Sequence, residues 1–192
     1  EMGKVYELGS DSYVLARVTP RKGRGKALDL CTGSGVHAVH SAVKGLLSSA
    51  VDINPRALMY TGFNSFLNEV DCSATLADLY SQTGAETYDL ITANPPFVPS
   101  PDKEVLIHRS AGETGEEVPE RLVAALPQKL NRGGLFSMVL EHPVFQDDPY
   151  LDRLERWLGE TQGWAILVLT FKEYPAAKYV VRHLGGVEDQ EA

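Results

Sequence analysis

Long hydrophobic runs are missing from this sequence of 192 residues. No apolar stretch approaches the roughly 20 residues that a membrane-spanning helix needs, and we expect no secretory signal. With 43% hydrophobic and 23% charged residues, the composition is that of a globular domain. We therefore expect a cytoplasmic protein with no membrane partner, whose core belongs to a single domain over residues 1–192.

Cysteine is scarce as well. Only Cys31 and Cys72 are present, and their separation matches no zinc-site spacing. Two free thiols in a cytoplasmic protein are the preferred interpretation over a disulfide.

Basic residues are outnumbered, with 18 Lys and Arg against 26 Asp and Glu and a net charge of −8. Such a chain is not expected to bind nucleic acid unaided, because neutralising phosphates takes a basic surface. One basic cluster, residues 21–26 (RKGRGK), is interpreted as a solvated linker before the first strand.

Short apolar runs alternate with amphipathic stretches, which predicts a parallel sheet covered by helices on both faces. No helix is expected between the last two strands, so they should pair antiparallel. The predicted fold is therefore α/β and Rossmann-like, with seven mostly parallel strands and an antiparallel last strand. Strands are expected at residues 26–31, 48–51, 73–76, 88–93, 135–140, 164–171 and 177–184, and helices at 11–18, 36–44, from 55, 118–130 and 150–158. The connection over residues 98–117 is long enough to suggest that it covers a site.

The turn after the first strand has the features of a cofactor-binding loop. Gly33-Ser34-Gly35 opens a helix, where glycines let the backbone approach a ligand and free amides face it. Asp52 ends the second strand, and a carboxylate there can accept hydrogen bonds from both hydroxyls of a ribose. Together they indicate an adenosine-containing cofactor, without separating a nicotinamide cofactor from S-adenosylmethionine.

Two later features separate these cofactors. Asp78 follows the third strand, where it can bond the exocyclic amine of an adenine while Leu79 packs beside the ring. Asn94-Pro95-Pro96-Phe97 ends the fourth strand, at the sheet edge that faces the ligand crevice.

The Asn94-Pro95-Pro96-Phe97 segment is suited to holding a planar NH2 group. Its prolines fix the backbone and remove two amide donors, which leaves the Pro95 carbonyl as an acceptor. The Asn94 side-chain oxygen is a second acceptor, and Phe97 offers a flat apolar face. Two acceptors on one NH2 favour a pyramidal nitrogen whose lone pair points at the sulfonium methyl group. Positioning then does most of the work, and no general base is needed before transfer.

These segments resemble the class I S-adenosylmethionine-dependent methyltransferases related to release-factor glutamine methyltransferases. The resemblance rests on Leu28–Gly35 (LDLCTGSG), Val51–Leu58 (VDINPRAL), Asp78 and Tyr88–Phe97 (YDLITANPPF), and it covers nearly the whole chain. It implies the same seven-stranded fold, with Asn94, Pro95, Pro96 and Phe97 holding the methylated nitrogen. The cofactor positions that it implies, with Leu79 and Asn94 added from the residues themselves, are Thr32, Gly33, Gly35, Asp52, Ile53, Asp78, Leu79 and Asn94.

The chain departs from that family at three points. Cys31 stands where glycine or another small residue is commoner, and Phe97 stands where the release-factor enzymes have tyrosine. The family's N-terminal recognition bundle is missing, and the sequence starts at Glu1, so we expect a trimmed or internal domain. The favoured substrate is a glutamine side chain in a protein, because the acidic surface disfavours nucleic acid.

Three alternatives stay open at this stage. A base methyltransferase could act on RNA or DNA with basic contacts supplied by a partner or by a missing region. A nicotinamide-dependent oxidoreductase could use the glycine turn, although it leaves the Asn-Pro-Pro-Phe segment unexplained. A non-catalytic binding subunit could keep the fold for assembly alone.

Several polar residues carry weaker signals. His37 and His40 have a spacing that metals use, but without a third ligand no metal site is expected. His108 and Arg109, near Glu113, Glu116 and Glu117, could belong to a substrate lid or to a solvated loop. The segment 141–143 (EHP) follows the fifth strand, where a packing role is favoured over a place at the substrate pocket.

Overall fold

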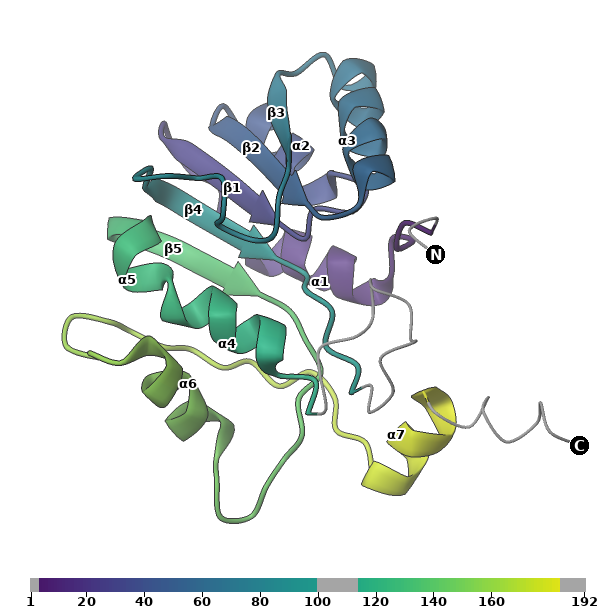
Figure 1. The fold of residues 1–192 in the computed structure, drawn as a ribbon, viewed down its shortest axis with the longest axis vertical. Helices are drawn as coiled ribbons and strands as arrows, with labels where there is room; N and C mark the ends of the chain where they lie inside the picture. The colour runs from purple at the N-terminus through teal and green to yellow at the C-terminus, as the bar shows by residue number, and fades with distance from the viewer. Residues whose placement is uncertain (1–3, 100–113, 184–192) are drawn as a thin grey trace, which may run out of the picture. The chain divides into compact units, whose positions relative to one another are not determined.

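A computed structural model describes residues 4–99 and 114–183 of the chain. Its contacts divide the chain into two units, Glu1–Glu160 and Thr161–Ala192. The first unit contains a parallel sheet with the strand order β3-β2-β1-β4-β5 (Figure 1). The Rossmann-like parallel sheet predicted from the sequence is therefore confirmed.

The strands and helices of the first unit alternate along the chain. In order they are α1 (Ser10–Val18), β1 (Lys26–Leu30), α2 (Val36–Val43), β2 (Leu47–Asp52), α3 (Pro55–Leu67), β3 (Cys72–Leu76), β4 (Tyr88–Ala93), α4 (Glu117–Ala124), α5 (Leu126–Lys129), β5 (Leu130–Met138) and α6 (Tyr150–Leu158). Right-handed crossovers place α2 and α3 on one face of the sheet and α4 on the other, because the chain reverses direction across the sheet after β3.

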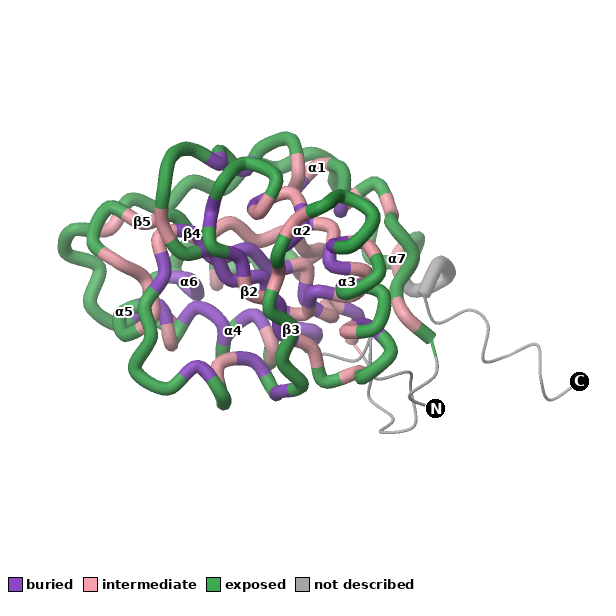
Figure 2. The backbone as a smooth tube through the Cα atoms, turned by 90° about the horizontal axis from the view of Figure 1, so that it is seen from above, coloured by how far each residue is buried: buried purple, intermediate pink, exposed green. Residues whose placement is uncertain are grey.

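The core lies around the two central strands, which are buried on both faces. Leu28, Leu30, Ile91 and Ala93 are at most 1% exposed, and Figure 2 shows the buried tube concentrated at the centre of the molecule's first unit. Continuous burial explains why β1 and β4 are almost uninterrupted apolar runs. β3, at the edge of the sheet, is largely exposed.

The start of α3 follows the rules for helix initiation. Asn54 accepts a hydrogen bond from the Arg56 amide at 3.0 Å, and Pro55 occupies the first helical position. This cap fixes the direction in which the chain leaves β2, directly after Asp52.

Two boundaries around β5 differ from the sequence prediction. The expected helix over 118–130 is divided into α4 and α5, because Pro127 has no amide hydrogen to continue the helical ladder. β5 begins at Leu130 and not at Leu135, since residues 131–134 lie within the strand as a bulge. A step of two residues along β4, from Tyr88 to Leu90, corresponds there to a step of five along β5, from Leu130 to Leu135. Gly133 has the positive φ of 79° that such a bulge uses.

The prediction of seven strands with an antiparallel last strand is wrong for the described residues. All five strands found there are parallel, and residues 164–171 form no strand. Residues 176–183 form the helix α7 (Ala176–His183), so the expected strand over 177–184 is a helix as far as it is described. Alanine, lysine and arginine favour a helix, and a strand needs a neighbour to complete its hydrogen bonds.

No helix in the described ranges is long and apolar enough to span a membrane. Both cysteines are free thiols, as expected.

Candidate active site

The carboxyl ends of β1 and β4 meet at the point where the strand order reverses. β1 continues through α2 to β2 on one side, whereas β4 continues through α4 towards β5 on the other. In open α/β sheets a ligand crevice forms outside such a switch point. The arrowheads of β1 and β4 in Figure 1 point towards α1, which lies across this end of the sheet.

The glycine turn after β1 has the backbone shape that the sequence predicted. Gly33 and Gly35 have φ angles of 55° and 81°, which favour glycine. A side chain at Gly35 would lie 2.7 Å from Thr61 Oγ1 on α3, whereas a side chain at Gly33 would meet no atom within 4 Å. Gly35 is therefore required for packing, and Gly33 leaves open space beside the turn.

Asp52 connects the end of β2 to this turn. Its carboxylate accepts hydrogen bonds from the Gly33 amide at 2.9 Å and from the Asn54 amide at 2.8 Å. Burial raises the pKa of Asp52 above its usual value, and the two amides oppose that rise. Each carboxylate oxygen keeps a further lone pair, so Asp52 can still accept hydrogen bonds from a ligand.

A buried carboxylate that the sequence analysis missed lies beneath the turn. Asp29 on β1 is 2% exposed and accepts hydrogen bonds from two hydroxyls. Thr32 Oγ1 donates at 2.6 Å, and Thr92 Oγ1 on β4 donates at 2.7 Å. Asp29 thus joins the turn to both central strands. The single acid within the apolar run KALDL was the available signal.

Asp78 and Leu79, which were predicted to lie at the adenine, and Ile53, which was predicted to bind the cofactor, differ in their exposure to solvent. Asp78 is exposed and forms an ion pair of 2.6 Å with Arg121 of α4, which the sequence did not predict. Leu79 is 6% exposed with a φ of 47°, and Ile53 is 46% exposed beside Asp52. A ligand at Asp78 therefore has to share that carboxylate with Arg121 or displace it.

Cys31 lies among these acids. It has a φ of 55°, a conformation in which glycine is favoured. Burial raises the pKa of the Cys31 thiol, and the negative charges of Asp52, Asp29 and Asp78 raise it further. That Cys31 lines the cofactor pocket stays a prediction.

The Asn94-Pro95-Pro96-Phe97 segment leaves the sheet directly after β4. Pro95 is buried, and Asn94, Pro96 and Phe97 are half-buried. The Asn94 side-chain nitrogen donates to Asp11 Oδ2 at 2.9 Å and to Ser12 Oγ at 3.2 Å, and both acceptors belong to α1. The sequence analysis assigned no role to these two residues, which are more than 80 positions away.

Gly115, near the end of the long connection that precedes α4, lies against the Asn94-Pro95-Pro96-Phe97 segment. A side chain at Gly115 would collide with the Phe97 carbonyl oxygen, so glycine permits the close approach. Next to it, Glu116 forms a buried ion pair of 3.1 Å with Arg153 of α6. The predicted lid residues His108, Arg109 and Glu113 lie outside the described residues.

The loop after β5 is held by the same arginine. Arg153 donates to the Pro143 carbonyl at 2.7 Å and to the Asp148 carbonyl at 2.6 Å. His142 stacks on Tyr150 with ring centroids 3.8 Å apart, and burial lowers the pKa of His142. These contacts support the packing role that was favoured for residues 141–143.

His37 and part of the basic cluster lie inside the protein. Arg21 is 9% exposed and donates to Ser41 Oγ at 3.2 Å, so it is not a solvated linker residue. His37 Nδ1 lies 3.4 Å from Arg21 Nη2, and burial lowers the pKa of His37. Within the described residues, no three His, Cys, Asp or Glu side chains form a metal-sized group.

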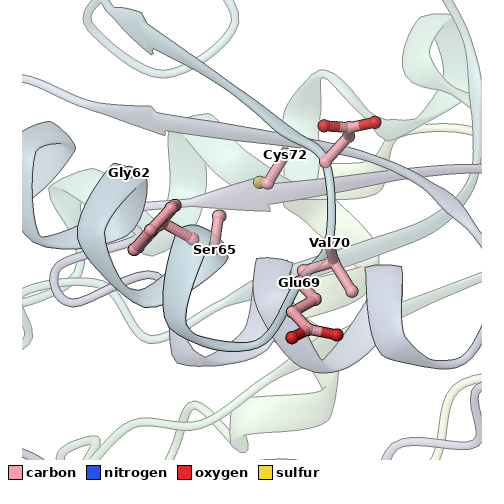
Figure 3. A pocket seen from close by; sticks show the side chains of 7 residues that line it. Gly62, Ser65, Glu69, Val70 and Cys72 are labelled. Atoms are coloured by element: carbon pink, nitrogen blue, oxygen red, sulfur yellow. The ribbon is translucent and has the colours of Figure 1, made fainter.

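Two surface pockets lie away from the carboxyl ends of β1 and β4. One is lined by the end of α3 and the start of β3, including Ser65, Val70 and Cys72 (Figure 3). The other is lined by Lys26, Leu47 and Ser48, at the starts of β1 and β2. Both therefore lie towards the amino ends of parallel strands, opposite the carboxyl ends that carry the predicted site.

Comparison with known proteins identifies the family. Residues 6–166 match the model of the methyltransferase small domain. The chain is 29% identical to a putative protein N5-glutamine methyltransferase of Methanocaldococcus jannaschii over 88% of each chain. It is 32% identical to the ribosomal protein uL3 glutamine methyltransferase of Xanthomonas campestris over 70% of this chain, and it spans 46% of that longer relative.

A solved structure supports the fold independently. The 16S rRNA N2 G1207 methyltransferase of T. thermophilus, in complex with AdoMet and guanosine, superposes with a TM-score of 0.59 at 23% identity. The match covers 78% of this chain and 38% of that one. These findings do not favour the oxidoreductase alternative. The chain belongs to the methyltransferase small domain family.

Proposed function

We propose that the chain methylates the side-chain nitrogen of a glutamine in a protein substrate, at Asn94, Pro95, Pro96 and Phe97. The observation that carries the proposal is the state of the Asn94 amide. Its nitrogen already donates to Asp11 and Ser12, so its oxygen is the atom left to accept from a substrate. An acceptor at the carboxyl end of β4 is what a substrate NH2 group requires.

The methyl donor of this family member is S-adenosylmethionine, and the crevice fits its adenosine part. The carboxylate of Asp52 has lone pairs for ribose hydroxyls, and the open side of Gly33 lets the backbone approach. We assign the cofactor to Thr32, Gly33, Gly35, Asp52, Ile53, Asp78, Leu79 and Asn94. When bound, it supplies a methyl group on a sulfonium sulfur, which departs as the neutral thioether when the substrate nitrogen bonds to the carbon.

The chain's own residues act on the substrate by position and by hydrogen bonding. The Asn94 oxygen and the Pro95 carbonyl each accept one N–H of the planar amide. Two such acceptors favour a pyramidal nitrogen, whose lone pair is no longer delocalised into the amide carbonyl. The lone pair can then attack the methyl group. Phe97 covers the apolar part of the substrate and excludes water. The product nitrogen is acidic after transfer and releases its proton to solvent.

Two observations favour glutamine in a protein over a nucleic-acid base. Relatives with substantial coverage carry the name glutamine methyltransferase. The net charge of −8 disfavours a phosphate backbone. We also propose a cytoplasmic location, which the two free thiols support.

The test is transfer of a labelled methyl group from S-adenosylmethionine to glutamine-containing peptides, to ribosomal proteins and to total RNA. Label on glutamine, located by mass spectrometry, is the expected result. Asn94→Ala should lower the rate by about 100- to 1,000-fold, as loss of a transition-state hydrogen bond does elsewhere. Asn68→Ala, which changes an exposed asparagine at the end of α3, is the control. Label in RNA alone would show that glutamine is the wrong substrate.

A further inference from the structure

We propose that Asp11 is a positioning residue, which fixes the Asn94 amide with its oxygen towards the substrate. This inference rests on the proposed function, because it concerns the orientation of the group that would hold the substrate nitrogen. It assigns a role to α1, which lies across the carboxyl ends of β1 and β4 (Figure 1).

The chemistry of the contact allows only one orientation of Asn94. The two faces of a side-chain amide have nearly the same shape, and an asparagine can present either its oxygen or its nitrogen to a ligand. An ionised carboxylate only accepts hydrogen bonds. The atom 2.9 Å from Asp11 Oδ2 is therefore the Asn94 nitrogen, since an oxygen there would face like charge without a hydrogen between them.

Ser12 completes the arrangement. Its hydroxyl oxygen is 3.2 Å from the same nitrogen, so each of the two N–H groups of Asn94 has its own acceptor. With both donors used, Asn94 has only an acceptor to offer. A carboxylate that accepts from the nitrogen also increases the negative charge on the amide oxygen, which strengthens that oxygen as an acceptor.

The chain before α1 leaves room for the Asp11 carboxylate. Gly9 caps the helix, and a side chain at this position would collide with Asp11 Oδ1. The Tyr6 hydroxyl lies on this same side and donates a hydrogen bond to Asp11 Oδ1 at 3.3 Å. Asp11 thus accepts from Tyr6 with one carboxylate oxygen and from Asn94 with the other.

A general role in helix stability would also place an acid here. Asp11 lies in the first turn of α1, where negative charge stabilises the helix by about 0.3–1 kcal/mol. Asp152 occupies the equivalent first turn of α6, is exposed, and lies on the helix that packs against α4. Asp152→Ala is therefore the matched control for the helix effect.

The experiment exchanges the hydrogen-bonding partners. Asn94→Asp keeps an acceptor for the substrate but puts two carboxylates in contact, so we expect its kcat to fall by at least 100-fold. The double variant Asp11→Asn with Asn94→Asp restores one donor between the two side chains, and should recover at least 10-fold of that loss. Asp11→Ala should lower kcat by about 10- to 100-fold, the equivalent of one charge-assisted hydrogen bond. Asp152→Ala should keep the wild-type kcat.

A spectroscopic readout makes the test independent of the substrate. In the 15N-labelled protein, the Asn94 side-chain NH2 signals are identified by their loss in Asn94→Asp. We expect these signals to move towards the position of a free amide in Asp11→Ala and not in Asp152→Ala. Unchanged signals, or a double variant no more active than Asn94→Asp, would overturn the role of Asp11. Methylation of a base in place of glutamine would overturn only the proposed substrate, because the exchange can be assayed on that base.

Discussion

At the scale of single residues, Cys31 is the clearest conflict between side chain and backbone. It follows β1 with a φ of 55°, where a residue with a Cβ atom loses about 1–2 kcal/mol relative to the right-handed region. Glycine has no such penalty. The chain therefore keeps a thiol directly after β1 in spite of a local conformational cost.

Two substitutions at Cys31 test this interpretation. Cys31→Gly should leave the free energy of unfolding within about 1 kcal/mol of the wild type, because relief of strain offsets the greater freedom of the unfolded chain. Cys31→Val should lower it by about 2 kcal/mol or more, since a β-branched side chain fits this conformation poorly. Urea unfolding measures both. Equal losses in the two variants would show that the thiol's packing matters more than the backbone conformation.

The positions of residues that follow a strand could be predicted from their neighbours in the sequence. Contacts between residues far apart in the sequence could not. Asp52, Gly33 and Asn94 stand at strand ends with recognisable neighbours, so the sequence placed them correctly beside the sheet's carboxyl edge. Asp11 contacts Asn94 across 83 positions of the chain, and nothing in the local pattern pairs them. Arg121 reached Asp78 in the same unpredicted way, across 43 positions.

At the scale of elements, one arginine holds α6 to α4 and to the loop after β5. The Arg153 side chain is 4% exposed, pairs with Glu116 and lies 4.8 Å from the centre of the Phe145 ring. Arg156, on the same helix, forms a 2.8 Å pair with Asp148 but is 57% exposed. The two arginines therefore offer a direct comparison of a buried and an exposed ion pair on one helix.

Arg153→Met should lower the free energy of unfolding by about 3 kcal/mol or more, because it leaves Glu116 buried without its partner. Arg156→Met should cost less than about 1 kcal/mol, as exposed pairs contribute little. Chemical denaturation of both variants measures the difference. Similar small losses would mean that water reaches Glu116 when the arginine is removed.

Elements with strong periodicity or clear boundary residues were predicted well. α3 starts where Asn54 and Pro55 place it, and β4 ends where the two prolines stop it. The sequence prediction started β5 too late, at residue 135, because Asn-Arg-Gly-Gly is also typical of the end of a helix. Sequence alone does not show a bulge. The last two predicted strands failed because pairing, and not local preference, decides whether an apolar run becomes a strand.

At the scale of the whole molecule, binding of the cofactor product should stabilise the fold. A ligand at 100 times its Kd adds about 2.7 kcal/mol to the stability of the state that binds it. For a domain of this size, S-adenosylhomocysteine should therefore raise Tm by about 5–10 °C. Asp52→Ala should abolish the rise, and NAD should produce none. Differential scanning calorimetry measures all three, and an equal rise with NAD would contradict the cofactor assignment.

The two hydrogen bonds that Asp29 accepts have a consequence for the affinity of the cofactor. Thr32 and Thr92 both donate to that one buried carboxylate, and the Thr32 amide donates to the Val51 carbonyl at 3.1 Å, so the turn is ordered before any ligand arrives. A loop that is already ordered loses little conformational entropy on binding, and most of the contact energy then appears as affinity. The turn can thus contain glycine, which is conformationally free in the unfolded chain, and still be rigid when the cofactor binds.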